Sequence, residues 1–215
     1  MKFDIKFQEY SDSERKEFKK FLNIEGRKVF TAGSIRTGEY ELILDVFRNL
    51  KDTVLILVPR HIERTPKICE LLKENNFKFI KYSEIIEKNY KNCEKFDIMI
   101  VDAIGILRKI YSITDIAFVG GTLVNIGGHS LLEPLFYGKT PIFGGYLQNV
   151  KEISKEILQY KIGYKAENKE EFLKAIESIE KKQDKSKSLI DDLFEKNKDV
   201  AINIINNIEK LELED

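Results

Sequence analysis

The sequence has 215 residues, of which 42% are hydrophobic, so it is long enough to bury a substantial core as one globular domain. Its 36 basic and 36 acidic residues cancel, which disfavours nucleic-acid binding and means that any anion must be recognised by a local site. Cys69 and Cys93 have neither a metal-ligand spacing nor the density of a secreted scaffold. With no signal peptide and no apolar run of eighteen residues, we expect a cytoplasmic protein.

Capping signals and apolar runs predict alternating helices and strands in the first half. Ser11 followed by Glu14 is a capping box for a charged helix that buries Phe18, Phe21 and Leu22 and stops at Gly26. The continuous apolar run at 53–58 is typical of a parallel strand buried on both faces. The predicted elements after the first helix are a strand at 28–32, a helix from 38, strands at 53–58 and 77–81 around a helix at 65–75, a polar connection, a strand at 97–101 and a helix from 104.

The second half continues the same alternation. A strand is predicted at 116–119, followed by a short helix that opens near Ser130, carries Pro134 in its first turn and ends at Gly138. The remaining elements are strands at 140–143 and 163–166, helices at 149–160 and 168–181, and a long closing helix from about 186 with one apolar stripe. Right-handed crossovers between these units predict an α/β, Rossmann-like, mostly parallel sheet with helices on both faces.

The glycine-rich stretch after 116–119 is the strongest candidate for ligand binding. Its glycine pairs allow tight turns, and the first N–H groups of the following helix point outward with partial positive charge. A phosphate or carboxylate is the natural occupant of the space in front of 127–130. Glu133 lies in the first turn of that helix, where a carboxylate complements the helix dipole even without a ligand.

Two other strand ends carry candidate residues, because ligands of open α/β sheets bind beyond the carboxyl ends of the strands. Arg60 follows the strand at 53–58, where its forked donors can grip a phosphate, or can pair with a structural carboxylate. His61 is as readily a packed residue as a ligand. Asp102 follows the strand at 97–101 and can cap the next helix, contact a ligand, or both.

Several spaced motifs resemble one family. Gly-Gly, Gly-Gly-His and Leu-Glu-Pro, followed by Gly-Lys-x-Pro and Gln-Asn, are similar to the nucleotide-sugar half of the Kdo transferases. These GT-B glycosyltransferases move 3-deoxy-D-manno-octulosonic acid (Kdo) from CMP-Kdo to lipid A precursors. The run 59–61 and the turns at 32–39 and 102–107 resemble further family loops, although Ile35, Arg36 and Ile106 depart from the common pattern. The positions that carry the main match are Gly120, Gly121, Gly127, Gly128, His129, Leu132, Glu133, Pro134, Gly138, Lys139, Pro141, Gln148 and Asn149.

The resemblance implies the C-terminal, donor-binding half of an inverting, metal-independent transferase with no cofactor. The catalytic base and the lipid A acceptor site then belong to an N-terminal domain outside this chain, at the cytoplasmic face of the inner membrane. It also implies a linker and helix at 1–27, a nucleotide-sugar domain at 28–183 and a closing helix at 184–215 that packs toward the missing domain or self-associates. The implied ligand-binding residues are Ser34, Pro59, Arg60, His61, Asp102, Ile104, Gly105, Gly120, Gly121, Gly127, Gly128, His129, Ser130, Glu133 and Asn149.

Other functions are weighed against this one. A dehydrogenase is disfavoured because the first strand-to-helix turn lacks Gly-x-Gly-x-x-Gly, and Arg60 stands where an acidic residue is needed. A P-loop NTPase is disfavoured because its phosphate-binding sequence is missing. A transferase that uses a UDP-sugar and a sugar-nucleotide-binding module without catalysis both remain open.

Overall fold

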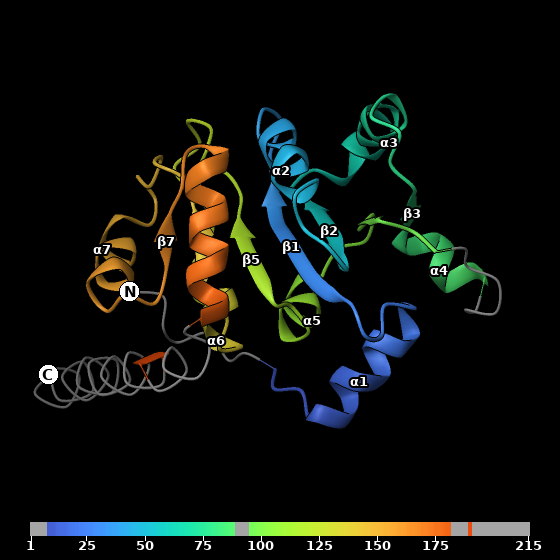
Figure 1. Ribbon diagram of the computed structural model, residues 1–215, viewed down its shortest axis with the longest axis horizontal. Coiled ribbons are helices and arrows are strands. Elements are labelled where there is room, and N and C mark those ends of the chain that lie inside the picture. Colours follow the sequence, from blue (N-terminus) through green and yellow to red (C-terminus); the bar gives the residue numbers. More distant parts are fainter. Residues whose placement is uncertain (1–7, 89–94, 182–188, 191–215) are drawn as a thin grey trace, which may run out of the picture.

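The computed structural model describes residues 8–88, 95–181 and 189–190, and these form one seven-stranded parallel sheet with helices on both faces (Figure 1). The strand order is β3-β4-β2-β1-β5-β6-β7, and every neighbouring pair is parallel. The predicted fold class is thereby confirmed. The strands are β1 (Lys28–Ile35), β2 (Thr53–Pro59), β3 (Phe79–Lys81), β4 (Ile98–Ile100), β5 (Ile116–Val119), β6 (Pro141–Phe143) and β7 (Tyr164–Lys165).

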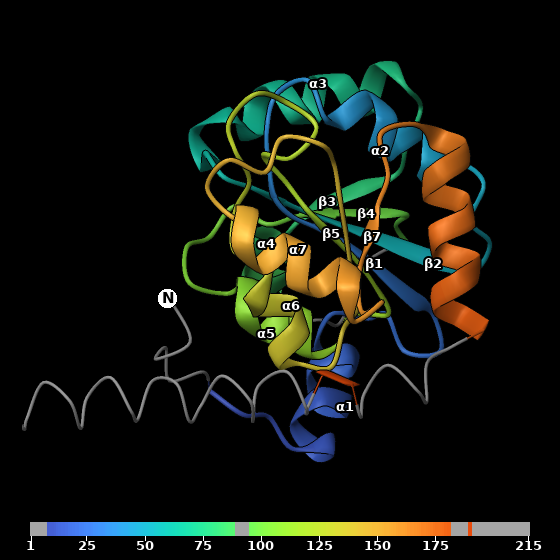
Figure 2. The same ribbon diagram turned by 90° about the vertical axis from the view of Figure 1, so that its left-hand side faces the viewer.

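The helices form a layer on each face of the sheet (Figure 2). One layer contains α2 (Tyr40–Phe47), α3 (Thr65–Glu74) and a helix at 169–181. A 3-10 turn, η1 (Ile62–Arg64), precedes α3. The second layer is made by α1 (Asp12–Phe21), α4 (Tyr82–Lys88), α5 (Leu107–Ser112), α6 (Leu132–Phe136) and α7 (Lys151–Gln159).

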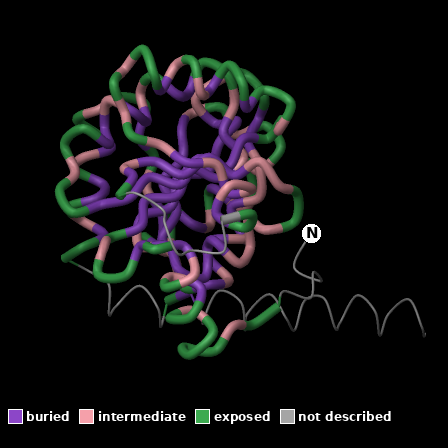
Figure 3. The backbone as a smooth tube through the Cα atoms, turned by 90° about the vertical axis from the view of Figure 1, so that its right-hand side faces the viewer, coloured by how far each residue is buried: buried purple, intermediate pink, exposed green. Residues whose placement is uncertain are grey.

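The central strands explain why both layers are needed. All seven residues of β2 are buried, and they alternate between the two cores: Leu55 and Leu57 pack toward α2 and α3, whereas Val54 and Ile56 pack toward α1 and α4. A strand that is apolar on both faces is stable only when both faces are covered. The buried segments accordingly run through the middle of the molecule, with exposed turns around them (Figure 3).

Several element boundaries differ from the predictions. The first helix has its capping box but ends at Phe21, before Gly26 is reached. The connection predicted to be polar contains α4, which buries Tyr82 and Ile85. The helix predicted from 104 begins at Leu107, and the one predicted near Ser130 begins at Leu132 and has five residues.

Two predictions fall largely outside the described residues. The amino-terminal segment 1–7 and the closing helix beyond Ile190 are not described, although Ile190 itself is buried against α6 and α7. The division of the chain at 27 and 183 stays a prediction. Across the described ranges, none of the helices combines the length and the apolar character that crossing a membrane requires.

The order of the strands places a crevice at one position. The chain builds β2 on one side of β1 and later adds β5 on the other side. The loops that leave the carboxyl ends of β1 and β5 therefore diverge from neighbouring strands, and such a switch point is where open α/β sheets bind their ligands.

Candidate functional site

A buried carboxylate joins the two loops at the switch point. Glu39 is fully buried at the start of α2, and its Oε2 accepts the N–H of Arg36 over 2.8 Å and that of Gly121 over 2.9 Å. Its Oε1 accepts the N–H of Thr122 over 3.1 Å and that of Leu123 over 2.9 Å. A buried charge needs such partners to offset its desolvation, and here the partners come from both loops. Glu39 thus fixes the β1–α2 loop against the β5–α6 loop.

The backbone N–H groups of the first glycine pair, Gly120 and Gly121, take part in this contact between the two loops. Gly120 donates its N–H to Gly33 O over 2.8 Å, and Gly121 donates to Glu39. A Cβ at Gly120 would lie 2.4 Å from Ser34 O, so the two loops approach more closely than any side chain permits. Both glycines are among the ligand-binding residues that the resemblance implies, but their amides bond inside the protein and do not face a ligand.

The second glycine pair shapes the loop before α6. Gly127 and Gly128 have φ of 94° and 87°, which is the left-handed region that favours glycine. The N–H of Gly128 donates to Gly121 O over 2.8 Å. The side-chain amide of Asn149 donates to Ile126 O over 2.9 Å, and the backbone N–H of Asn149 donates to Gly127 O. Asn149 therefore braces the loop. Ser130 follows, half-buried, and no partner of its N–H or hydroxyl lies in the part of the chain that the structure describes.

An arginine between two histidines lies across the crevice. Arg36 Nε donates to His129 Nε2 over 3.1 Å, and Arg36 Nη1 is 2.7 Å from His61 Nε2. Because a guanidinium can only donate, both Nε2 atoms are acceptors, and His61 carries its proton on Nδ1, which is 3.0 Å from Glu63 Oε1. Burial, together with Arg36, Arg60 and His61, lowers the pKa of His129 to about 4. At neutral pH His129 is uncharged and orients Arg36.

Arg60 is exposed immediately beyond β2. Its N–H bonds Ile35 O over 3.1 Å, and Pro59 before it is buried beside Ile35. Among the described residues the guanidinium has no hydrogen-bond or ion-pair partner, so the predicted alternative of a structural carboxylate pair finds no support there. Ser34, near the end of β1, has φ of 53° at the irregularity in the pairing with β2, a strained conformation for a residue with a side chain.

Asp102 has a different structural role from the one predicted. Its carboxylate accepts the N–H of Ser83 over 2.9 Å and the Ser83 hydroxyl over 2.6 Å, so it caps α4 and not α5. Ile104 and Gly105 follow in an exposed turn, with Ile104 88% exposed. Glu133 on α6 lies 3.4 Å from Arg108 Nε through Oε1, and its Oε2 has no partner in the described ranges.

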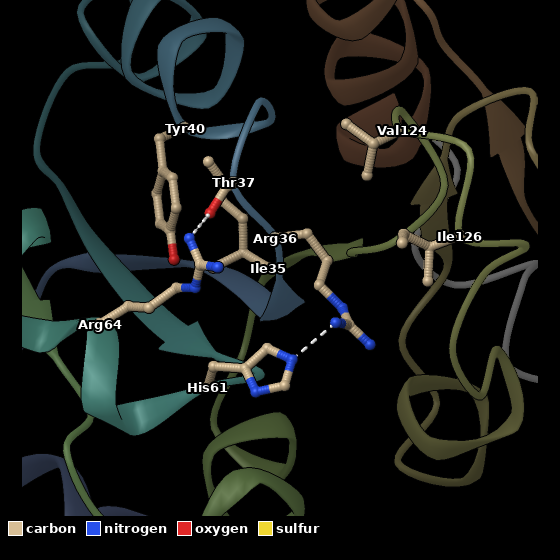
Figure 4. A pocket seen from close by; sticks show the side chains of 8 residues that line it. All are labelled: Ile35, Arg36, Thr37, Tyr40, His61, Arg64, Val124 and Ile126. Atoms are coloured by element: carbon tan, nitrogen blue, oxygen red, sulfur yellow. Dashed lines mark hydrogen bonds between the residues drawn. The ribbon is translucent and has the colours of Figure 1, made fainter.

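A cleft of about 210 Å³ opens beside Arg36 (Figure 4). Arg64 reaches into it from η1 and donates to Thr37 Oγ1 over 2.7 Å. Val124 and Ile126 from the β5–α6 loop form its apolar wall, opposite Tyr40. Burial, with the Glu39 charge adding to it, raises the pKa of Tyr40, whose hydroxyl stays protonated. A second, more open groove of about 570 Å³ lies nearer α3, and Cys69, Lys81 and Asp102 are among the residues that line it.

The predicted residues only partly meet at one place. The contacts link His61 to His129 through Arg36, and they place Arg60 close enough to lower the pKa of His129. Gly120, Gly121, Asn149 and Asp102 instead hold the surrounding loops. The sequence reasoning did not select Arg36, Glu39, Tyr40 or Arg64. The run 34–39, which resembles a family loop but departs at Arg36, was the available signal for the first two.

No family model matches the chain, but several known proteins are similar to it. A bifunctional glycosyltransferase/methyltransferase of Fusobacterium nucleatum is 59% identical over 205 residues, which are 95% of this chain and 32% of that protein. The 3-deoxy-D-manno-octulosonic acid transferase of Aquifex aeolicus is 39% identical over 146 residues, or 66% of this chain and 39% of that protein. The Haemophilus influenzae transferase of the same name is 39% identical over 137 residues, or 62% of this chain and 31% of that protein.

A solved structure has the same fold. The crystal structure of the C-terminal CMP-Kdo binding domain of WaaA from Acinetobacter baumannii matches with a TM-score of 0.71 at 22% identity, over 83% of this chain and 93% of that one. The chain spans about a third of the length of the curated relatives it matches. The predicted resemblance is confirmed: the chain is a relative of the Kdo transferases and corresponds to their C-terminal half.

Proposed function

We propose that this chain is the donor-binding half of a glycosyltransferase that transfers Kdo from CMP-Kdo to a lipid A precursor in lipopolysaccharide synthesis. The observation that carries the proposal is the group of cations at the switch point, where Arg36 and Arg60 stand beyond the carboxyl ends of β1 and β2. This is a chain whose relatives are named for Kdo transfer. An anionic donor is the ligand that such a site favours.

Arg60 is the residue that takes the phosphate in this proposal. Its guanidinium is exposed and unpaired among the described residues, so no protein bond has to break before it grips two phosphate oxygens. Ser130 and the adjacent backbone offer further donors in front of α6. These groups stabilise the charge that grows on the leaving phosphate as the bond to the sugar breaks.

The nucleoside has two places to bind. Glu133 keeps Oε2 available to accept a ribose hydroxyl while Oε1 faces Arg108. The turn at Ile104 and Gly105 is exposed and leads away from β4, which lets its backbone meet the edge of a base. Cytosine has a donor at N4 and an acceptor at N3, whereas uracil has an acceptor at O4 and a donor at N3, so one backbone C=O and one N–H suffice to distinguish the two bases.

The chemistry proposed is inverting transfer without a metal ion. The acceptor hydroxyl attacks the anomeric carbon and gives its proton to a carboxylate, while CMP departs with the bonding electrons. Arg60 and the donors in front of α6 supply the positive charge that a metal would otherwise provide at the phosphate. The base and the acceptor site lie in a domain beyond this chain, consistent with the third of the relatives' length that the chain spans. We place the whole protein at the cytoplasmic face of the inner membrane.

One relative is named for two activities, and the glycosyltransferase activity fits the matched stretch better than the methyltransferase activity does. The Fusobacterium nucleatum protein is a glycosyltransferase and a methyltransferase, and the matched stretch is 32% of it. The same stretch of this chain also matches transferases named for Kdo alone. We therefore assign the match to the glycosyltransferase part. A UDP-sugar transferase remains the nearest competitor.

Calorimetry with CMP, UMP and NAD, each titrated separately into the chain, tests the proposal. CMP should bind more tightly than either of the others. If UMP binds at least as tightly as CMP, the UDP-sugar alternative replaces the Kdo assignment. If no nucleotide binds at millimolar concentration, the chain is not a donor-binding domain.

A further inference from the structure

The two arginines that line this cleft, Arg36 and Arg64, have no anionic partner among the described residues. Arg36 bonds the two imidazoles, and Arg64 bonds the Thr37 hydroxyl, so neither guanidinium group has a carboxylate among its hydrogen-bond partners there. Arg36 is partly withdrawn from water, where a charge without a counter-ion is unfavourable, whereas Arg64 is exposed at the mouth of the cleft. The cleft is therefore arranged to receive a negative charge from outside the chain.

The acidic groups nearby do not fill this role. Glu39 lies beneath the loop, but all of its described bonds go to four backbone N–H groups. Glu63 lies near His61 Nδ1, and 70% of its side chain is exposed. Neither carboxylate forms an ion pair with Arg36 or Arg64 in the structure.

Arg36 is held so that its remaining donors are already placed. Its N–H is fixed by Glu39, Nε by His129 and one hydrogen of Nη1 by His61. A guanidinium has five N–H hydrogens, which leaves the second hydrogen of Nη1 and both hydrogens of Nη2 for a ligand. Figure 4 shows this end of Arg36 directed into the open space between His61 and the Ile126 wall. A pre-oriented fork loses little side-chain entropy on binding.

The cleft is too large for a single ion and has two kinds of wall. Its volume of about 210 Å³ is roughly seven times the share of one water molecule in the liquid, about 30 Å³. Its apolar lining comes from Ile35, Val124 and Ile126, and its polar lining comes from Arg36, Thr37, Tyr40, His61 and Arg64. An organic group that carries one acidic function matches this lining better than inorganic phosphate does.

We propose that the cleft beside Arg36 binds the carboxylate of the donor's acidic sugar, while Arg60 binds the phosphate. This inference rests on the proposed function and deepens it, since a donor such as CMP-Kdo carries one negative charge on its phosphodiester and another on its sugar. Arg36 is then the residue that distinguishes an acidic sugar from a neutral one, with Arg64 as a second cation in the same cleft.

The test compares two ligands on the same variants. The affinities of the chain for CMP and CMP-Kdo are measured by calorimetry, and the ratio of the two dissociation constants reports the sugar contribution. The wild-type chain should bind CMP-Kdo more tightly than CMP. Arg36→Gln should reduce that preference by about tenfold or more, equivalent to about 1.4 kcal/mol, and leave CMP affinity within about twofold. Arg48→Gln removes the same charge at the far end of α2 and should change neither affinity.

A second probe separates the cleft from the nucleotide site. Free Kdo and its methyl ester, which lacks the charge, are titrated while the methyl NMR signals of Val124 and Ile126 are followed. Kdo should shift these signals more than the ester does, and Arg36→Gln should remove the difference. If Kdo shifts the signals in this way but CMP does not bind, the carboxylate site is supported and the proposed nucleotide site is not. Equal loss of CMP and CMP-Kdo affinity in Arg36→Gln, or no shift with Kdo up to its solubility limit, overturns it.

Discussion

Replacing Glu39 by Gln should loosen both loops of the site at once. The carboxylate accepts four backbone N–H groups, two on each oxygen, over 2.8 to 3.1 Å. Glutamine keeps one oxygen, so its amide NH₂ group must face two N–H donors that then have no acceptor. Hydrogen bonds to a charged group contribute about 1.5 to 3 kcal/mol each, and losing two predicts a loss of about 3 to 6 kcal/mol in the free energy of unfolding. For a domain of this size, at about 2 to 4 °C per kcal/mol, that corresponds to a fall of roughly 6 to 24 °C in Tm.

Chemical denaturation at pH 7 measures this loss, and two variants calibrate it. Glu41→Gln removes an exposed carboxylate from the first turn of the same helix and should cost only a few tenths of a kcal/mol. Glu39→Asp keeps the charge but is shorter by one methylene, so it should fall between Gln and the wild type. The reasoning is refuted if Glu39→Gln lies within about 1 kcal/mol of the wild type, because the four bonds would then contribute no more than neutral ones.

Three further predictions concern the site. Arg60→Ala should weaken CMP binding about tenfold or more by calorimetry and leave Tm nearly unchanged; a sharp fall in Tm with CMP affinity retained would make Arg60 structural. Because the pKa of His129 is lowered to about 4 from an ordinary 6.5, the unfolded chain binds more protons between these pH values, and stability should fall as pH drops from about 6.5 toward 4. Denaturation at pH 7 and at pH 5 should show a smaller fall in stability for His129→Gln than for the wild type. An equal fall in both proteins contradicts the assignment. The chain alone should transfer no Kdo from CMP-Kdo to a lipid A precursor until an N-terminal domain is added. Holding acceptor, base and donor together lowers the activation barrier by roughly 7 to 11 kcal/mol. Transfer by the isolated chain would argue against a divided site.

The fold was largely predictable because the apolar pattern of the strands is local. The run 53–58 is apolar at every position after Thr53 and became β2, and 116–119 became β5 with the predicted bounds. The connection that contains α4 was missed because only Tyr82 and Ile85 are buried in seven residues, too few to establish a helical period. Capping signals located α1, since Ser11 and Glu14 bond as the sequence implies.

The site was less predictable because its key contacts join distant residues. Arg36 meets His129 across 93 positions, and Glu39 meets Leu123 across 84, so no local pattern reveals either pair. A glycine-rich loop indicates that backbone approaches closely, but not what approaches it. For Gly120 and Gly121 the partners proved to be Gly33 and Glu39 within the chain. For Asp102, the sequence suggested a cap on the helix that follows it, but the helix that it caps is α4, which precedes it.

The position of bound CMP tests the account most directly, and a crystal structure of the chain with CMP measures it. We predict that the phosphate lies against the guanidinium of Arg60, in the crevice between the loops that leave β1 and β5, with the ribose near Glu133. A nucleotide bound instead in the groove beside Cys69 and Lys81, or anywhere else with Arg60 free, would contradict the account.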